Sequence, residues 1–104
     1  MSIYENLRKL NLEIPSAPNP VGSYVAYKKT KNLLFISGQI SIDAYGKITK
    51  GKLGKELSLS EGQAAAKLCA INIIAQAKKA CNEKLEDIKN CIKLTGYVNS
   101  TNEF

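Results

Sequence analysis

The sequence contains no histidine. This absence excludes a Ser-His-Asp triad, a Cys-His pair and any metal site built on imidazole, because each of them needs the histidine ring. Any proton transfer must therefore use a carboxylate, a tyrosine, a lysine or a positioned water molecule.

Cysteines and long apolar runs are also scarce. The three cysteines (Cys69, Cys81 and Cys91) are odd in number and contain no C-x-x-C pair. The first residues lack a basic start followed by an apolar segment, so we expect no secretory signal and reduced thiols in a cytoplasmic protein. No stretch approaches the roughly 20 apolar residues of a membrane helix, and we expect no membrane partner.

Arginine occurs once, at Arg8, so the net charge of +6 comes mainly from lysine. The charge has two interpretations: solvated loops around the strands, or attraction to nucleic acid or small anions. A nucleic-acid surface usually interleaves arginine or aromatic residues with its lysines. We therefore favour solvated loops and expect no nucleic-acid partner.

The length of 104 residues and the hydrophobic content of 44% are those of one small globular domain, residues 1–104. A chain of this size buries about 60 to 70% of the surface of its unfolded form, which leaves its stability thin. We expect oligomerisation to help stabilise it.

The most informative stretch runs from Pro20 to Asp43. Aromatic and β-branched residues in Ser23–Tyr27 and Leu33–Ser37 predict two strands, and the polar segment between them predicts a hairpin loop over Lys28–Asn32. Gly38 interrupts the apolar run, and such a glycine usually marks a bulge or a close backbone approach. The break can aim Ser37 and Gln39 toward a ligand.

Two segments predict helices. Ser2 is a candidate cap for a short helix up to Leu10. Ser58 and Glu61 form an S-x-x-E capping box that opens a helix from Leu59 to about Cys81, with a broad apolar stripe. The residues expected to interrupt this stripe are Lys67, Asn72, Gln76, Lys78 and Lys79.

Shorter elements complete the pattern. Leu12–Ile14 is a possible strand, and the loop at residues 15–20 contains three prolines, which forbid a helix. Alternation over Asn90–Val98 predicts a last strand. A second S-x-x-E box, Ser100–Glu103, has no helix after it, so we expect the chain to be the N-terminal part, or a shortened version, of a longer domain.

Four of these segments together resemble the RidA (YjgF/YER057c/UK114, endoribonuclease L-PSP) family. They are P-V-G-S-Y, N-L-L-F-I-S-G-Q-I, L-S-L-S-E-G-Q-A-A-A-K-L-C-A-I-N and K-L-T-G-Y-V-N-S, in this order. The resemblance implies an α+β, chorismate-mutase-like fold: a mixed sheet packed by helices on one face. It also implies a homotrimer with ligand clefts between subunits. Residues 1–19 would form an N-terminal extension and proline-rich loop. Residues 20–104 would form a partial core without the closing helix and two strands.

The family's activity is the hydrolysis of 2-imino and 2-enamino acids to 2-keto acids and ammonia, without a metal or an organic cofactor. By resemblance, Tyr24 matches the catalytic tyrosine, and Ser37, Gly38 and Gln39 match the substrate cleft. The family's carboxylate-binding arginine and water-positioning glutamate belong to the closing strands, and Arg8 lies outside the matching motifs. We therefore expect the reaction to be impaired in this chain.

Other interpretations remain open. The protein is alternatively a non-catalytic trimer that binds small carboxylates, or an RNA-binding, endoribonuclease-type translation inhibitor. Tyr24 is alternatively a half-buried strand aromatic, and Ser37 and Gln39 are alternatively edge-strand polar residues. Cys69 and Cys81 are expected to be small core residues.

Overall fold

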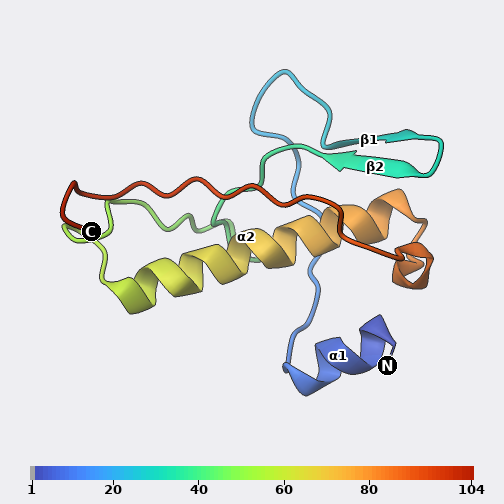
Figure 1. Ribbon diagram of the computed structural model, residues 1–104, viewed down its shortest axis with the longest axis horizontal. Coiled ribbons are helices and arrows are strands. Elements are labelled where there is room, and N and C mark those ends of the chain that lie inside the picture. The colour runs from blue at the N-terminus through green and yellow to red at the C-terminus, as the bar shows by residue number, and fades with distance from the viewer. Residues whose placement is uncertain (1) are drawn as a thin grey trace.

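The computed structural model describes residues 2–104 and has the α+β class predicted from the sequence. Its elements in chain order are helix α1 (Ile3–Lys9), strands β1 (Tyr27–Thr30) and β2 (Leu33–Ile36), helix α2 (Leu59–Ala80) and the 3-10 turn η1 (Leu85–Asp87). In Figure 1, α2 runs through the middle of the molecule, with the β1–β2 hairpin on one side and α1 on the other.

Helix α2 begins where the capping box predicted. The Ser58 hydroxyl accepts the backbone N–H of Glu61 at 3.2 Å, and the Glu61 carboxylate accepts the backbone N–H of Ser58 at 2.9 Å. Two N–H groups that the helix itself cannot pair are satisfied in this way. Lys78 and Lys79 lie in the last turn, where positive charge is favourable to the helix dipole.

Strand β2 forms within one residue of the predicted Leu33–Ser37, whereas β1 is displaced along the sequence from the predicted Ser23–Tyr27. Tyr27 pairs with Ile36 and Thr30 pairs with Leu33, so the loop contains only Lys31 and Asn32, with Lys31 at φ 54°. The predicted first strand at Ser23–Tyr27 and loop at Lys28–Asn32 are therefore wrong by several residues. The polar composition of residues 28–30 predicts a loop, but these residues form most of β1. They face solvent, so the strand does not need apolar side chains there.

The core lies beneath the hairpin, around the C-terminal half of α2. Its buried apolar residues are Ala75, Ala77, Ala80 and Leu85. Alanines let the hairpin lie close to the helix, and Lys29 ties β1 to the helix end by donating to the Ala80 carbonyl at 3.0 Å. The apolar stripe of α2 is buried only in part, because Ala64, Ala66 and Ala70 are exposed.

The predicted last strand at Asn90–Val98 does not form. This segment runs past α2 in an extended course toward the C-terminus (Figure 1), and all nine of its residues are exposed. A strand requires a neighbour to pair with, and the segment meets one only beyond its end, where Leu53 bridges to Ser100. No strand forms at Leu12–Ile14 either, and Ser100–Glu103 ends in a turn.

Helix α1 is attached to the turn η1 by hydrogen bonds of Tyr4. Ser2 caps the helix, as predicted, by accepting the N–H of Glu5 at 3.1 Å. The Tyr4 hydroxyl donates to the Glu86 carboxylate and accepts the Leu85 N–H at 3.0 Å, which joins α1 to η1. Within residues 2–104, no helix combines the length and apolar character needed to cross a membrane.

Candidate functional site

A small cavity of about 30 Å³ lies where the proline-rich loop, the segment after β2 and helix α2 meet. It extends from exposed residues such as Val21 (69% exposed) to Gln76, which is 1% exposed. The residues that line it are Pro18, Asn19, Pro20, Val21, Tyr24, Ala26, Gly38, Gln39, Ile40, Ile42 and Gln76. We refer to this cavity as the Tyr24 pocket.

The Tyr24 side chain forms part of the outer wall of the pocket. It is 44% exposed, and the one hydrogen bond that its hydroxyl receives from residues 2–104 is a long contact from the Val21 N–H at 3.4 Å. A side chain at Gly22 would meet the Tyr24 ring at 3.0 Å, so the glycine allows the ring to lie over the backbone. The phenol is accessible to a small molecule, and it is not a core aromatic.

The structure brings Tyr24, Gly38 and Gln39 together around the pocket, but it does not include Ser37 in the lining. The Ser37 hydroxyl donates to the Val25 carbonyl at 2.5 Å, and its backbone N–H donates to the Ala26 carbonyl at 2.9 Å. In this chain Ser37 therefore closes the base of the hairpin, and its hydroxyl proton is already in use.

Gly38 lines the pocket with space beside it. A Cβ atom built at Gly38 meets no atom within 4 Å, and its φ is not in the left-handed region. The close backbone approach expected from the sequence is therefore not made by any described residue. The backbone at Gly38 is therefore not crowded by the described residues.

Two buried carboxamides of α2 were missed as site residues. The amide nitrogen of Asn72 donates to the carbonyls of Ile40 (3.1 Å) and Ile42 (2.9 Å). The amide nitrogen of Gln76 donates to the Pro18 carbonyl at 2.7 Å. These hydrogen bonds attach two walls of the pocket, the segment after β2 and the proline-rich loop, to helix α2.

The sequence did contain a signal for these two residues. Asn72 and Gln76 are four residues apart, and Leu68 and Ala80 continue the same spacing on either side. Residues at this spacing share one helix face, so the amides lie on the core face and do not interrupt it. Both are buried, at 3% and 1% exposure, because backbone carbonyls satisfy their N–H groups.

The pocket is uncharged. Among the described residues that line it, the Tyr24 phenol is the one ionisable group. Recognition in the pocket would therefore depend on hydrogen bonds to the phenol, the carboxamides and the backbone. Within residues 2–104, no group of three His, Cys, Asp or Glu side chains is placed to hold a metal ion.

A second, larger hollow of about 350 Å³ lies between α1 and the end of α2. Its lining residues are Tyr4, Leu7, Arg8, Leu12, Ile14, Lys78 and Leu85. The sole arginine of the chain is therefore at this hollow and not in the Tyr24 pocket, which agrees with the position of Arg8 outside the matching motifs.

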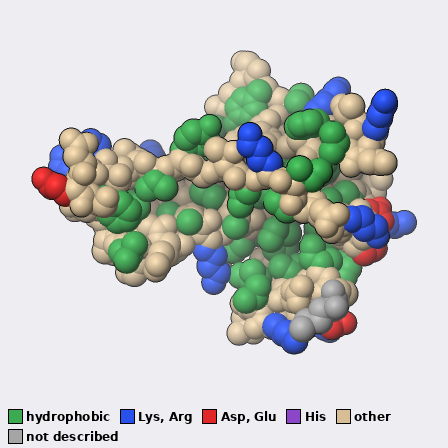
Figure 2. Space-filling view, in the orientation of Figure 1, with side chains coloured by type: hydrophobic (Ala, Val, Ile, Leu, Met, Phe, Trp, Pro, Cys, Tyr) green, Lys and Arg blue, Asp and Glu red, His purple; other side chains and the backbone are tan. Residues whose placement is uncertain are grey.

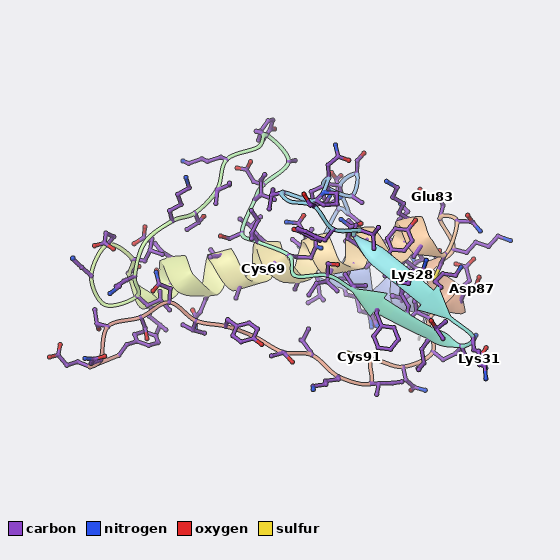
Figure 3. All side chains as sticks on the ribbon, turned by 90° about the horizontal axis from the view of Figure 1, so that it is seen from above. Lys28, Lys31, Cys69, Glu83, Asp87 and Cys91 are labelled. Atoms are coloured by element: carbon purple, nitrogen blue, oxygen red, sulfur yellow. The ribbon has the colours of Figure 1, made fainter. Side chains whose placement is uncertain are left out.

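The remaining reactive and charged side chains are dispersed. The cysteines are free, and Figure 3 shows Cys69 on α2 and Cys91 on the extended segment. Burial raises the pKa of the Cys69 thiol, which makes it less reactive. Lys28 and Lys31 project from the hairpin (Figure 3), and on the face shown in Figure 2 the basic side chains are scattered without forming one patch.

The protein is an α+β domain in which a β-hairpin packs on a long helix, with a pocket where the two meet. The family model described as "YjgF/chorismate_mutase-like, putative endoribonuclease" matches residues 5–103. The chain belongs to this family, as the four sequence motifs predicted.

Relatives and solved structures agree with this assignment. The chain is 36% identical to Protein TCP17 of Trypanosoma cruzi over 99 residues, which is 95% of this chain and 61% of that protein. It is 28% identical to a RutC family protein of Pyrococcus abyssi over 89 residues, which is 85% of this chain and 60% of that protein.

The structure is similar to the crystal structure of protein Atu1372 from Agrobacterium tumefaciens, with a TM-score of 0.82 and 39% identity over 96% of this chain and 61% of that one. It is also similar to a "putative endoribonuclease" from Shewanella oneidensis, with a TM-score of 0.72 and 36% identity over 80% of this chain and 55% of that one. The chain therefore spans about three fifths of the length of these relatives.

Proposed function

We propose that the Tyr24 pocket is one wall of a site that binds small 2-imino or 2-enamino acids and takes part in their hydrolysis to 2-keto acids and ammonia. The observation that supports this most is that Tyr24, Gly38 and Gln39, separated by up to 15 positions, line one cavity. The family resemblance assigns these same residues to the catalytic tyrosine and the substrate cleft.

The chemistry needs no cofactor. Water adds to the carbon of the C=N bond, the C–N bond of the resulting carbinolamine breaks, and ammonia leaves as the carbonyl forms. A phenol can orient the water or donate a proton to the departing nitrogen. Tyr24 is suited to this role because its hydroxyl donates to no described residue.

The site needs a cation for the substrate carboxylate, and the Tyr24 pocket has none. We propose that a neighbouring subunit of a homotrimer, or further residues of a longer chain, supply it. Exposed apolar side chains support a subunit interface: Leu33 and Phe35 on β2 are 44% and 59% exposed, and Ile92 and Leu94 are 79% and 70% exposed.

Free cysteines support a cytoplasmic location.

Binding without turnover is the second candidate function, and it is favoured because Tyr24 is the one ionisable residue among residues 2–104 that lines the pocket, which leaves few groups for proton transfer. One experiment separates the two. A dehydratase generates the imine in the presence of semicarbazide, which traps it, and release of the 2-keto acid is followed with and without the chain. Faster release that is lost in Tyr24→Phe and kept in Tyr45→Phe supports hydrolysis. Tyr45 is 95% exposed and does not line the pocket, so it is the matched control.

The outcomes of that assay are distinct. No acceleration, together with binding of the stable product 2-ketobutyrate in calorimetry, would support the binding protein. The absence of both would contradict the proposed site. RNA binding that weakens steeply with salt would instead favour the nucleic-acid alternative.

A further inference from the structure

The second hollow, between α1 and the end of α2, has the size and the lining of a small-molecule site. Its volume of about 350 Å³ lies within the range of ligand pockets, about 300–1,000 Å³. We refer to it as the Arg8 hollow. It shares no lining residue with the Tyr24 pocket, so the two are separate places on the described part of the chain.

Helix α1 turns one face toward the Arg8 hollow. Tyr4, Leu7 and Arg8 are three and four residues apart, so they lie on the same side of the helix. Figure 1 shows α1 lying apart from α2, joined to the rest of the chain by the blue segment that follows it. The bonds of the Tyr4 hydroxyl to the Glu86 carboxylate and the Leu85 N–H keep α1 in this position.

The apolar wall of the hollow is only partly covered by the protein. Leu85 is buried, at 2% exposure, but Leu7, Leu12 and Ile14 are each half-buried. An apolar tail lying against these three side chains would remove more of their surface from water, which is favourable. The wall therefore fits the hydrocarbon part of a ligand.

The charge at the hollow is positive. Arg8 and Lys78 line it, and none of the described lining residues is acidic. Lys78 is already paired, because its Nζ atom lies 3.6 Å from the Oε2 atom of Glu83.

The Arg8 guanidinium is exposed and forms no ion pair or hydrogen bond with residues 2–104, so it is available to an anion from solvent. A guanidinium can donate two parallel hydrogen bonds to a carboxylate. One unpaired cation balances one negative charge, which favours a carboxylate over a dianionic phosphate.

We propose that the Arg8 hollow binds a medium-chain carboxylate, with the carboxylate on Arg8 and the acyl tail against Leu7, Leu12 and Ile14. This site is independent of the proposed hydrolysis, which belongs to the Tyr24 pocket. The apolar part of 2-ketobutyrate is one ethyl group, which covers little of the wall, so the two sites prefer different ligands.

Octanoate, butyrate and octylamine test the proposal, because they vary the tail and the charge separately. Each is titrated into the ¹⁵N-labelled full chain, and the backbone amides of Arg8, Leu12 and Gly38 are followed by NMR. We expect octanoate to shift Arg8 and Leu12 and to bind at least about tenfold more tightly than butyrate, since its longer tail buries more apolar surface.

Octanoate should also bind at least about fivefold more tightly than octylamine, which has the same tail and a positive charge at neutral pH. Octanoate binding no more tightly than either comparator would overturn the proposal. Octanoate shifts confined to Gly38 and its neighbours would overturn it as well, because the ligand would then occupy the Tyr24 pocket.

Arg8→Gln should weaken octanoate binding about fivefold, the effect of one exposed charged partner. The thermal midpoint should stay nearly unchanged, because the guanidinium bonds to none of residues 2–104. Lys50→Gln is the matched control: it removes the same charge from an exposed residue that does not line the hollow, and it should keep the affinity. Unchanged binding by Arg8→Gln, or an equal loss in both variants, would contradict the proposal.

Discussion

The amide nitrogen of Gln76 lies 3.4 Å from the side-chain oxygen of Gln39, at the junction of α2 with the segment that follows β2. The Gln39 amide nitrogen in turn donates to the Ser37 carbonyl at 3.0 Å. A chain of amide contacts thus connects the helix with the end of the hairpin. These hydrogen bonds between uncharged groups position the wall of the pocket. Substitutions that remove such bonds should lower stability, and substitutions of side chains that contact only the ligand should weaken binding.

Replacing Tyr24 tests the outer wall. Tyr24→Phe removes a hydroxyl that makes one long contact within the chain, so the free energy of unfolding should change by no more than about 0.5 kcal/mol. Binding of 2-ketobutyrate should weaken about fivefold, because the ligand loses one hydrogen bond. Calorimetry measures this, with Tyr45→Phe as the control. Unchanged affinity would remove Tyr24 from the site.

A methyl group at Gly38 separates folding from binding. A Cβ at Gly38 meets nothing within 4 Å and the residue does not have a positive φ, so Gly38→Ala should leave the thermal midpoint nearly unchanged. It should weaken 2-ketobutyrate binding, because Gly38 lines the pocket and the proposed site brings the ligand against its backbone. Gly96→Ala is the matched control, because its Cβ also meets nothing within 4 Å and Gly96 does not line the pocket. Equal binding by both variants would show that no ligand approaches the Gly38 backbone.

Asn72 should stabilise the pocket without contacting a ligand. Asn72→Ala removes the donors to the Ile40 and Ile42 carbonyls from a site that is 3% exposed. We expect the free energy of unfolding to fall by about 2–3 kcal/mol, since buried carbonyls lose their partners. Urea denaturation measures this, with the exposed Asn90→Ala as control. A loss no larger than that of the control would mean that water replaces the amide.

The capping box should make stability sensitive to acid. Hydrogen bonds from Ser58 hold the pKa of Glu61 below its usual value of 4.5. A carboxyl whose pKa is lower in the folded state stabilises the fold above its unfolded pKa, and this contribution disappears as the pH falls through the folded value. The unfolding midpoint of the unsubstituted chain should therefore decline below about pH 4.5 more than that of Glu61→Gln.

Glu103→Gln is the control for this effect, because Glu103 is an exposed carboxylate near the C-terminus. Its midpoint should follow that of the unsubstituted chain across the acid range. Identical acid profiles for Glu61→Gln and Glu103→Gln would exclude the capping box as the source of the effect.

The sequence was sufficient where one local signal determines the structure. The S-x-x-E box at Ser58 and the long run of helix formers placed α2 to within one residue of its C-terminal end. The motifs named Tyr24, Ser37, Gly38 and Gln39 as site residues, and all of these except Ser37 line one pocket. In both cases the determining residues are close in sequence or belong to a recognised pattern.

The sequence was insufficient where a distant partner decides the outcome. Lys28 and Lys29 belong to β1 because Phe35 and Leu34 lie opposite them, which composition cannot reveal. Asn90–Val98 has strand alternation but meets no neighbouring strand along its length. The spacing of Gln76 places it on the core face of α2, but the partner that satisfies its buried N–H, the Pro18 carbonyl, is 58 residues away and cannot be read from the sequence.

The most direct test of the Tyr24 pocket is a chemical-shift map of the ¹⁵N-labelled chain titrated with 2-ketobutyrate. The uncharged Tyr24 pocket and the hollow lined by Arg8 and Lys78 are two competing places for this ligand to bind. We predict that the largest shifts occur at Tyr24, Gly38, Gln39 and the Gln76 side chain. Shifts confined to the residues around Arg8 and Lys78 would contradict the assignment of the site.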